Sequence, residues 1–343
     1  MADIVTNFDL TDEQQMIRET VREFSRDVIA PGAAEADETC TFNMPAWEGM
    51  RELGLPGLPF DEEWGGAGLD NLSYILAVEE IARVCASTSL AYAAHVSLGT
   101  WPIHAFGSQA LKERWLPGLV SGEFMGAYGL TEPGAGSDSG ATATTAVKDG
   151  DEYLVNGAKC FITNGSYSRS FVITAQTDKS KGPKGIVAMV IDREQPGFTI
   201  EKGEEKLGMR GSDWVNLVFQ DCKVPADSVL GPAGEGFVTF MKTLDGGRIS
   251  IGALSLGIAD GAYQCARRYA LEREAFGGTL ANLQAVRFKI ANMALDVEAS
   301  RHLVYHAARL KDQGLPFSKE AAMAKLHASE TAMRVTWSTT RRA

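Results

Sequence analysis

Hydrophobic residues recur every three or four positions over residues 11–120, and this spacing predicts helices. The apolar positions of the first run are Ile17, Val21, Phe24 and Val28. Thr11, with Gln14 three residues later, forms a capping-box pattern and should begin this helix. Pro31 has no backbone N–H, so we expect it to end or break the run. A second helical stretch is expected at about residues 71–95.

Short runs of β-branched residues replace the helical spacing between about residues 125 and 230. These runs are SFVITAQT (170–177), GIVAMVID (185–192) and VNLVF (215–219). Asn156 and Gly157 lie between two further apolar runs, and the pair predicts a hairpin because both residues tolerate positive φ. This zone is expected to form a small β domain.

From about residue 235 onward the helical spacing returns. One apolar stripe consists of Leu283, Val286, Ile290, Met293, Val297 and Val304. Its spacing predicts a helix that packs one face inward, as in a bundle. The sequence therefore predicts an α+β fold with three domains. These are an N-terminal helical domain (1–122), a middle β domain (123–232) and a C-terminal helical bundle (233–343).

Composition narrows the class of protein. The 343 residues are 45% hydrophobic, enough for a large core, and no run approaches the roughly 20 apolar residues of a membrane span. The first residues lack the features of a secretory signal, and the five cysteines are scattered, so we expect a cytoplasmic protein with reduced thiols. A net charge of −11 disfavours nucleic acid and anionic membranes as partners. Small molecules and proteins are the expected partners.

The stretch YGLTEPGAGSDSGA (128–141) concentrates glycine where the helical zone meets the first β segment. Gly134 and Gly136 would let backbone N–H groups approach a bulky ligand, and Thr131 and Ser137 add hydroxyl groups. The stretch is neither a G-x-x-x-x-G-K-[ST] phosphate loop nor a G-x-G-x-x-G nucleotide fingerprint. These residues alone leave open a ligand-binding loop and a glycine-rich turn between domains.

The same stretch resembles the signature of the acyl-CoA dehydrogenase family. Three further motifs follow in the family's order. KCFITNG (159–165) resembles the family's K-x-W-I-T-N-G strand, KLGMRGSDWVNLVFQDCKVP (206–225) its K-x-G-x-R-x-S segment, and EREAFGGTLANLQ (272–284) its E-R-x-x-F-G-x(5,6)-Q segment. The likeness covers roughly residues 8–335. It implies the family's fold, with a barrel-like middle β domain and a C-terminal bundle that is incomplete here.

This resemblance implies that FAD binds between the middle and C-terminal domains. The residues that it assigns to FAD are Tyr128, Leu130, Thr131, Gly136, Ser137, Phe161, Ile162, Thr163, Arg273, Phe276 and Gln284. Phe161 stands where a tryptophan is common in the family, and both side chains are flat and apolar. Arg273, Phe276 and Gln284 would contact the adenosine half of FAD that a neighbouring subunit mainly binds. A homo-oligomer, a tetramer as in the family, is therefore expected.

The substrate implied by the resemblance is an acyl-CoA thioester. The residues assigned to it are Ser137, Asp245, Gly246, Gly247 and Arg248. The reaction removes hydrogen from two adjacent carbons, giving the trans-2-enoyl-CoA, and the electrons leave through an electron-transfer flavoprotein. The motif spacing, without a large insertion, is similar to that of the short-chain or branched-chain members.

The catalytic base is where the sequence departs from the family. The family's glutamate stands in a Y-E-G-T-type segment beyond the point at which this sequence stops, or, in some branches, just before the CoA-binding arginine. The second position is Gly247 here, so no catalytic residue is assigned. The last residues, VTWSTTRRA (335–343), lose the family's pattern, and TWSTTRRA (336–343) carries no core periodicity. We therefore expect a truncated chain or a change of reading frame near residue 336.

Three functions stay open on this reading: a dehydrogenase, a catalytically silent flavin or acyl-CoA binding protein, and an oxidase that passes electrons to oxygen. Glu132, next to Pro133 in the signature, is interpreted as a structural hydrogen-bond acceptor and not as a base. Glu298, His302 and His306 recur every four residues without an H-E-x-x-H motif, so surface positions are favoured over a metal site.

Overall fold

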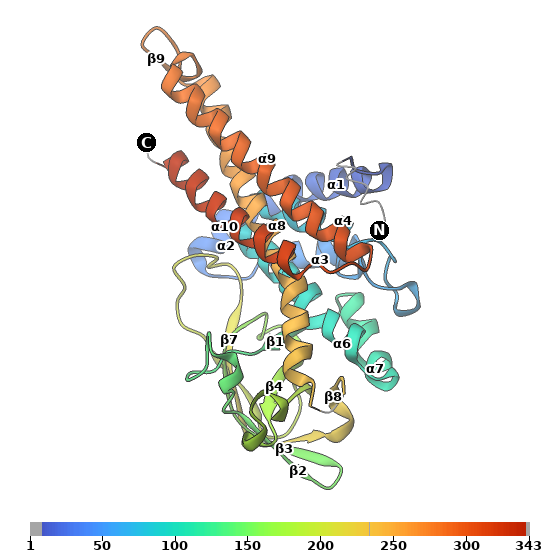
Figure 1. The fold of residues 1–343 in the computed structure, drawn as a ribbon. Coiled ribbons are helices and arrows are strands. Elements are labelled where there is room, and N and C mark those ends of the chain that lie inside the picture. Colours follow the sequence, from blue (N-terminus) through green and yellow to red (C-terminus); the bar gives the residue numbers. More distant parts are fainter. Residues whose placement is uncertain (1–8, 233, 341–343) are drawn as a thin grey trace. The chain divides into compact units, whose positions relative to one another are not determined.

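The computed structural model describes residues 9–232 and 234–340 (Figure 1). The chain forms two compact units. The first, the helical unit, consists of Met1–Pro31, Asp70–Ala86 and Arg248–Ala343. The second, the sheet unit, consists of Gly32–Leu69 and Ser87–Gly247. The order of helices, then strands, then helices confirms the α+β expectation, whereas the domain boundaries proposed from the sequence stay predictions.

An eight-stranded sheet is the centre of the sheet unit as far as the structure describes it. Its strands are β1 (Met125–Gly129), β2 (Thr145–Asp149), β3 (Glu152–Thr163), β4 (Ser168–Gln176), β5 (Ile186–Asp192), β6 (Phe198–Lys202), β7 (Trp214–Pro225) and β8 (Val229–Leu230). They lie in the order β6-β7-β3-β2-β4-β5-β8, and β1 pairs in parallel with β4. The three β-branched runs fall in β4, β5 and β7, as predicted. Alternate side chains such as Phe171, Met189 and Leu217 form the core of this unit.

The predicted hairpin at Asn156 and Gly157 is wrong. Strand β3 continues through both residues and pairs with β7 along its length, with a register shift between Val155 and Gly157. Gly157 has φ +144°, a conformation that this bulge accommodates because glycine has no Cβ. The actual turn joins β2 to β3 at Gly150, which has φ +59°. An Asn-Gly pair thus marks a bulge here, since the long partner strand holds β3 extended.

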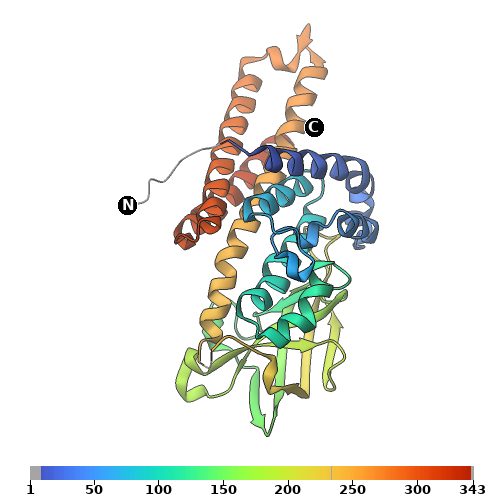
Figure 2. The same cartoon turned by 90° about the vertical axis from the view of Figure 1, so that its right-hand side faces the viewer.

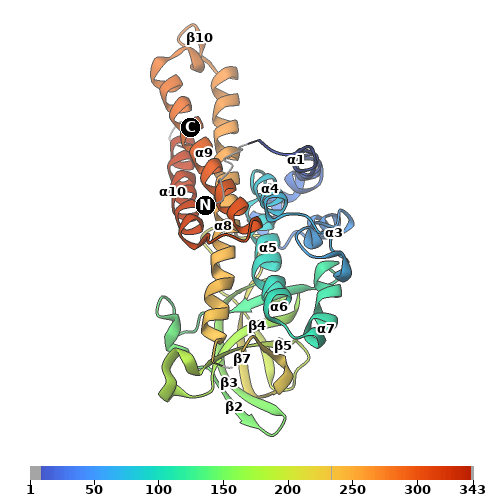
Figure 3. The same cartoon turned by 45° about the vertical axis from the view of Figure 1, so that its right-hand side comes forward.

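The sheet unit also contains helices, and Figure 3 shows α5, α6 and α7 next to the sheet. The helices are α2 (Ala30–Thr39), α3 (Met44–Glu52), α5 (Ala86–Ala94), the π-helix η4 (His95–Thr100), α6 (Trp101–Phe106), α7 (Gln109–Val120) and the start of α8 (Gly236–Glu272). Short 3-10 turns are η2 (Leu55–Gly57), η3 (Glu62–Trp64), η5 (Ser139–Ala141), η6 (Lys179–Gly185) and η7 (Ala226–Ser228).

Strand β1 is held against η4 at unusually short range. A Cβ added to Gly99 would lie 2.4 Å from the backbone of Gly126, so only glycine permits this approach. His95 of the same π-helix accepts the Gly126 N–H at Nδ1 (3.1 Å), and its Nε2 donates to the carbonyl oxygen of Leu119 (2.9 Å). Complete burial lowers the pKa of His95 to about 4, so the ring is neutral at neutral pH.

The helical unit contains long helices that run antiparallel to one another, as Figure 2 shows for α8 and α9. Its elements are α1 (Asp12–Phe24), the π-helix η1 (Ser25–Ile29), α4 (Asn71–Ala82), most of α8, α9 (Gln284–Asp312), α10 (Ser318–Thr340), the β9–β10 hairpin (Glu274–Ala275 and Gly278–Thr279) and the 3-10 turn η8 (Leu280–Asn282). The predicted inward face of α9 is confirmed from Met293 onward, since Met293, Val297 and Val304 are buried. Leu283, Val286 and Ile290 are only half-buried. The predicted capping box between Thr11 and Gln14 is also confirmed.

The expectation that Pro31 ends or breaks the first helical run is met by a local break. The chain stays helical through Pro31, but the regular α-helix α1 stops at Phe24. The preceding turn becomes π-helical, with the Ala30 N–H donating to the Ser25 carbonyl, and Pro31 falls at the start of α2, where its missing N–H is tolerated. The last residues, which lose the family's sequence pattern, still form a helix over the described part of the chain. Helix α10 runs to Thr340, and Val335 within it is almost fully buried.

A buried ionic network joins α4, α8 and α9 inside the helical unit. Glu79 accepts a hydrogen bond from the Tyr305 hydroxyl (2.6 Å) and from Arg301 (3.2 Å). Arg301 also reaches Asp260 (3.4 Å), which pairs with Arg83. Each buried charge therefore has a partner, as the low interior dielectric requires.

No helix within the described ranges combines the length and hydrophobicity needed to cross a membrane.

The buried neutral His95 makes a testable contribution to stability. Its folded-state pKa lies below the ordinary 6.5, so its contribution is complete above pH 6.5 and is lost as the pH falls toward 4. Between pH 7 and pH 5 the unfolding free energy should fall by about 2 kcal/mol more than in the variant His95→Gln, which keeps a donor and an acceptor. Denaturant unfolding at both pH values measures this difference, and equal pH slopes would contradict it.

Candidate active site

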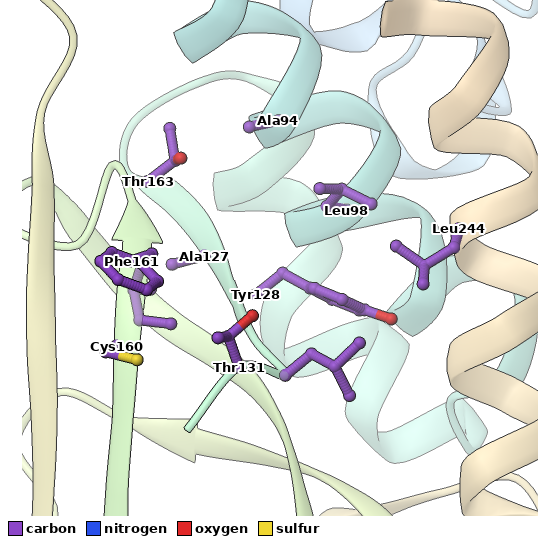
Figure 4. Close-up of a pocket in the computed structure, with 11 residues that line it drawn as sticks. Ala94, Leu98, Ala127, Tyr128, Thr131, Cys160, Phe161, Thr163 and Leu244 are labelled. Carbon is purple, nitrogen blue, oxygen red and sulfur yellow. The ribbon is translucent and has the colours of Figure 1, made fainter. Parts of the chain in front are cut away.

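A cavity of about 180 Å³ lies in the sheet unit (Figure 4). Its lining residues are Ala94, Leu98, Ala127, Tyr128, Leu130, Thr131, Cys160, Phe161, Ile162, Thr163 and Leu244. They come from four places: the end of β1 with the loop after it, the end of β3, the α5–η4 segment, and α8. Six of the eleven residues assigned to FAD from the sequence line this one cavity, three on β3 and three on the β1 side.

The wall formed by β3 has an unusual backbone. Phe161 adopts φ +62°, a left-handed conformation that is costly for a residue with a side chain. The register with β7 shifts between Lys159 and Ile162, so Phe161 lies on a bulge. Phe161 is 65% exposed, and its ring stacks on Trp214, with centroids 5.2 Å apart. The fold thus holds a large apolar ring at the cavity edge, at a cost in backbone strain.

The opposite wall begins with Tyr128 at the end of β1. Figure 4 shows its side chain extending between the helices that carry Leu98 and Leu244. The Tyr128 hydroxyl donates to the carbonyl oxygen of Phe240 (3.1 Å), and the two rings stack at 4.3 Å. Burial raises the pKa of Tyr128 well above its usual value, so the phenol stays neutral. Tyr128 is therefore a fixed apolar wall and not an acid or base.

The glycines of the loop after β1 leave room that the protein itself does not fill. A Cβ on Gly134 or Gly136 would meet no protein atom within 4 Å, and neither residue has a left-handed backbone. Gly129, by contrast, would bring a Cβ within 3.1 Å of Ile173. Since nothing in the chain requires glycine at positions 134 and 136, the open space fits an external group that approaches the backbone. Ser137, next to them, is exposed.

Glu132 closes this loop and is a structural acceptor, as the sequence analysis proposed. Its carboxylate accepts the backbone N–H groups of Ala143 (2.7 Å) and Thr144 (3.1 Å). It also receives a hydrogen bond from Lys159 on β3 (2.6 Å). Its oxygens are thus engaged with the chain's own donors.

The residues assigned to CoA follow Leu244 on α8. Asp245 is partly exposed, whereas Gly246 and Gly247 are buried. A Cβ on Gly247 would lie 3.2 Å from a methyl group of Leu98, which lines the cavity. Position 247 therefore faces the helical wall of the cavity. Arg248 is the next residue of α8 and the first of its segment of the helical unit.

The residues assigned to a neighbouring subunit's FAD lie elsewhere. Phe276 and Gly277 form the two-residue turn of the β9–β10 hairpin, with φ +56° and +79°. The side chain of Phe276 is 93% exposed. Arg273 precedes this hairpin, Gln284 begins α9, and both are exposed. None of the three lines the cavity within the described part of the chain, and their role stays a prediction.

Sequence reasoning missed the helical side of the cavity. Ala94 and Leu98 are one helical turn apart, and Leu98 lies beyond the helical stretch predicted at residues 71–95, whose apolar pattern gives no sign of which face meets a ligand. Leu244 directly precedes the CoA segment, a proximity that could have identified it. Within the described residues no group of three metal-ligating side chains is placed to hold a metal ion.

Comparison with known proteins agrees with this geometry. The chain matches the acyl-CoA dehydrogenase N-terminal domain over residues 11–123, the middle domain over 127–222 and the C-terminal domain over 234–339. It is 50% identical over 330 residues to the short-chain specific acyl-CoA dehydrogenase of Clostridium acetobutylicum, covering 96% of this chain and 87% of that protein.

Solved structures extend the likeness to the fold. The butyryl-CoA dehydrogenase of Megasphaera elsdenii matches with a TM-score of 0.95 and 44% identity, covering 98% of this chain and 88% of that one. A chain from a structure described as the electron transferring flavoprotein of Acidaminococcus fermentans matches with a TM-score of 0.96 and 46% identity, with the same coverage. The chain belongs to the acyl-CoA dehydrogenase family.

Proposed function

We propose that this protein catalyses the FAD-dependent α,β-dehydrogenation of a short-chain acyl-CoA thioester to the trans-2-enoyl-CoA. The observation that carries the proposal is one cavity that brings together the two sequence motifs assigned to flavin and is lined by Leu244, the residue before the α8 segment assigned to CoA. The high identity to a short-chain specific relative supports the substrate class. An electron-transfer flavoprotein is the proposed electron acceptor.

The residues around the cavity fit a flat cofactor. Bound FAD would supply a two-electron acceptor for the reaction. Leu130 and Ile162 offer apolar surfaces on opposite walls and would exclude water from the slot. Thr131 and Thr163 place hydroxyl groups at the same cavity, where each can donate or accept one hydrogen bond. Gly136 would leave space for the diphosphate.

The substrate would enter along α8. Asp245 and Arg248 offer a carboxylate and a guanidinium, which suit the polar groups and phosphates of CoA. Leu98 and Leu244 form an apolar wall, which suits an acyl chain in the same cavity. Removal of the α proton requires a base and hydrogen bonds that polarise the thioester carbonyl.

A second candidate, a flavin or acyl-CoA binding protein without turnover, is favoured by one observation. Within the described chain, none of the residues lining the cavity carries a carboxylate, and position 247 is glycine. The two candidates share a binding site and differ only in whether a base reaches the substrate.

For the assembly we propose a homotetramer, in which the exposed Phe276 hairpin would meet the FAD of another subunit.

An anaerobic visible spectrum separates the candidates. The purified protein is supplied with FAD and then titrated with butyryl-CoA. Loss of the oxidised flavin band is the expected result, because dehydrogenation of the thioester reduces the flavin. A bound flavin that keeps its band would support the silent binding protein. Peroxide formed at the rate of turnover after admission of air would indicate the oxidase instead.

Position 247 tests the placement of the base. Gly247→Glu should allow or increase bleaching by butyryl-CoA, because position 247 faces the cavity wall and Leu98 needs to move by only a few tenths of an ångström. The matched control Gly247→Gln has the same shape but cannot take a proton. Equal bleaching rates in the two variants would show that a carboxylate at this position plays no part.

The open space at Gly136 predicts a binding defect without a folding defect. Gly136→Ala should raise the FAD dissociation constant by roughly tenfold, about 1.4 kcal/mol, because the added methyl group occupies space meant for the ligand. Gly208→Ala is the matched control, since a Cβ there also meets no protein atom and the residue lies outside the cavity. Both variants should unfold at the temperature of the unsubstituted apoprotein. Equal FAD affinity in both variants would contradict the assignment.

A further inference from the structure

Lys159 is a fully buried lysine next to the proposed flavin cavity. Its ammonium group lies 2.6 Å from the Glu132 carboxylate, 2.9 Å from the Thr174 hydroxyl and 3.3 Å from the carbonyl oxygen of Leu130. These three acceptors match the three N–H donors of an ammonium group. The side chain of Lys159 has no exposed surface, and that of Glu132 is 4% exposed.

The ionised pair is well satisfied in spite of its burial. Burial opposes the charge on both groups, lowering the pKa of Lys159 and raising that of Glu132. For Glu132, the nearby lysine and the Thr144 and Ala143 hydrogen bonds outweigh burial, and its pKa is lowered overall. The carboxylate is thus ionised at neutral pH. Removing one partner would leave the other charge buried and uncompensated.

Each partner is adjacent in sequence to one wall of the cavity. Glu132 follows Thr131, and Lys159 precedes Cys160 and the strained Phe161. The Cys160 N–H donates to the Thr131 carbonyl (2.9 Å), so a backbone bond also joins the two walls beside the ion pair. Thr174, on β4, ties the pair to the central sheet.

We propose that Glu132 and Lys159 act as a clamp that fixes the width of the flavin slot and the direction of Phe161 at its edge. The inference rests on the proposed function, since it assigns positioning residues to that same site. The two side chains touch no ligand in this role. They act through Leu130 and Thr131 on one wall and through the β3 bulge on the other.

An ion pair is suited to this task for a physical reason. Apolar side chains of the same volume could stabilise the fold equally well, but their packing is non-directional. Three directed hydrogen bonds fix one relative position of loop and strand. The clamp therefore predicts that variants lacking the ion pair bind FAD more weakly than their loss of folding stability alone would explain.

The test uses Lys159→Met, Glu132→Gln and the double variant, measured first for FAD binding to apoprotein. Each single variant should raise the FAD dissociation constant by roughly 10- to 100-fold, the size of effect seen when residues that orient the contacts of a binding site are removed. The double variant should recover part of the loss, since no charge is left uncompensated. The visible and circular-dichroism spectra of bound flavin should also change in the single variants.

A matched control removes a different ion pair from the sheet unit. Arg114→Met breaks the contact between Arg114 and Asp192 (2.9 Å), neither of which lines the cavity. It should leave the FAD dissociation constant within about twofold and the flavin spectrum unchanged, since electrostatic contributions of partly exposed pairs are small and local.

A milder variant keeps the inference testable where the charge variants fail to fold. Thr174→Val removes one hydrogen bond to Lys159 and retains the ion pair. It should weaken FAD binding by roughly tenfold or less and shift the flavin spectrum, whereas Thr331→Val, a buried threonine of α10, should do neither.

Unchanged FAD affinity and spectrum in Thr174→Val and in the folded charge variants would overturn the clamp. So would losses of affinity that merely follow the melting temperatures across all variants, controls included. The proposed function fails differently: the unsubstituted protein would bind FAD without bleaching by butyryl-CoA, a result that leaves the binding measurements intact.

Discussion

The close approach of η4 to β1 is the constraint on which the rest of the sheet unit depends. Gly99 and Gly126 meet at a distance that no other residue permits, and His95 adds a hydrogen bond to the same strand. This contact positions β1 near its start, and Tyr128 and the loop after the strand follow within a few residues. Leu98, on the same π-helix as Gly99, is thereby placed at the wall opposite the strand residues. The cavity is thus a consequence of how two backbones pack.

Strand β3 departs from local preference at two residues at or beside the cavity. Lysine is rarely buried, and phenylalanine rarely adopts positive φ, yet Lys159 and Phe161 do so within three residues. Each departure is supported from outside β3, by Glu132 in one case and by Trp214 in the other. Such local conflicts persist only where the surrounding fold over-determines them, and they gather at functional sites. The pattern is what a precisely shaped cofactor slot requires.

Much of the fold could be predicted from spacing alone, because periodicity reports directly which faces are buried. The strands β4, β5 and β7, the capping box at Thr11 and the inward face of α9 follow from such patterns. The error occurred where tertiary pairing overrides a local signal, because the Asn156-Gly157 pair is absorbed into a long strand. Pro31 breaks the regular helix through a π-turn and does not end it. The helical wall of the site carries no motif, since apolar helix residues look alike whether they face core or ligand.

In this cavity, the apolar walls that would bind the reactants are distinct from the base that would take the α proton. Among the residues that the structure describes, the titratable groups lining it are Tyr128 and Cys160, and burial raises the pKa of both, so both are neutral at neutral pH. The slot is therefore uncharged, which suits an apolar ring and an acyl chain. A carboxylate reaching into these surroundings would be desolvated beside Leu98 and Leu244, and its pKa would rise toward the range in which a general base works best. The same apolar walls that bind the reactants would thus also make such a base more effective, wherever along the chain it originates.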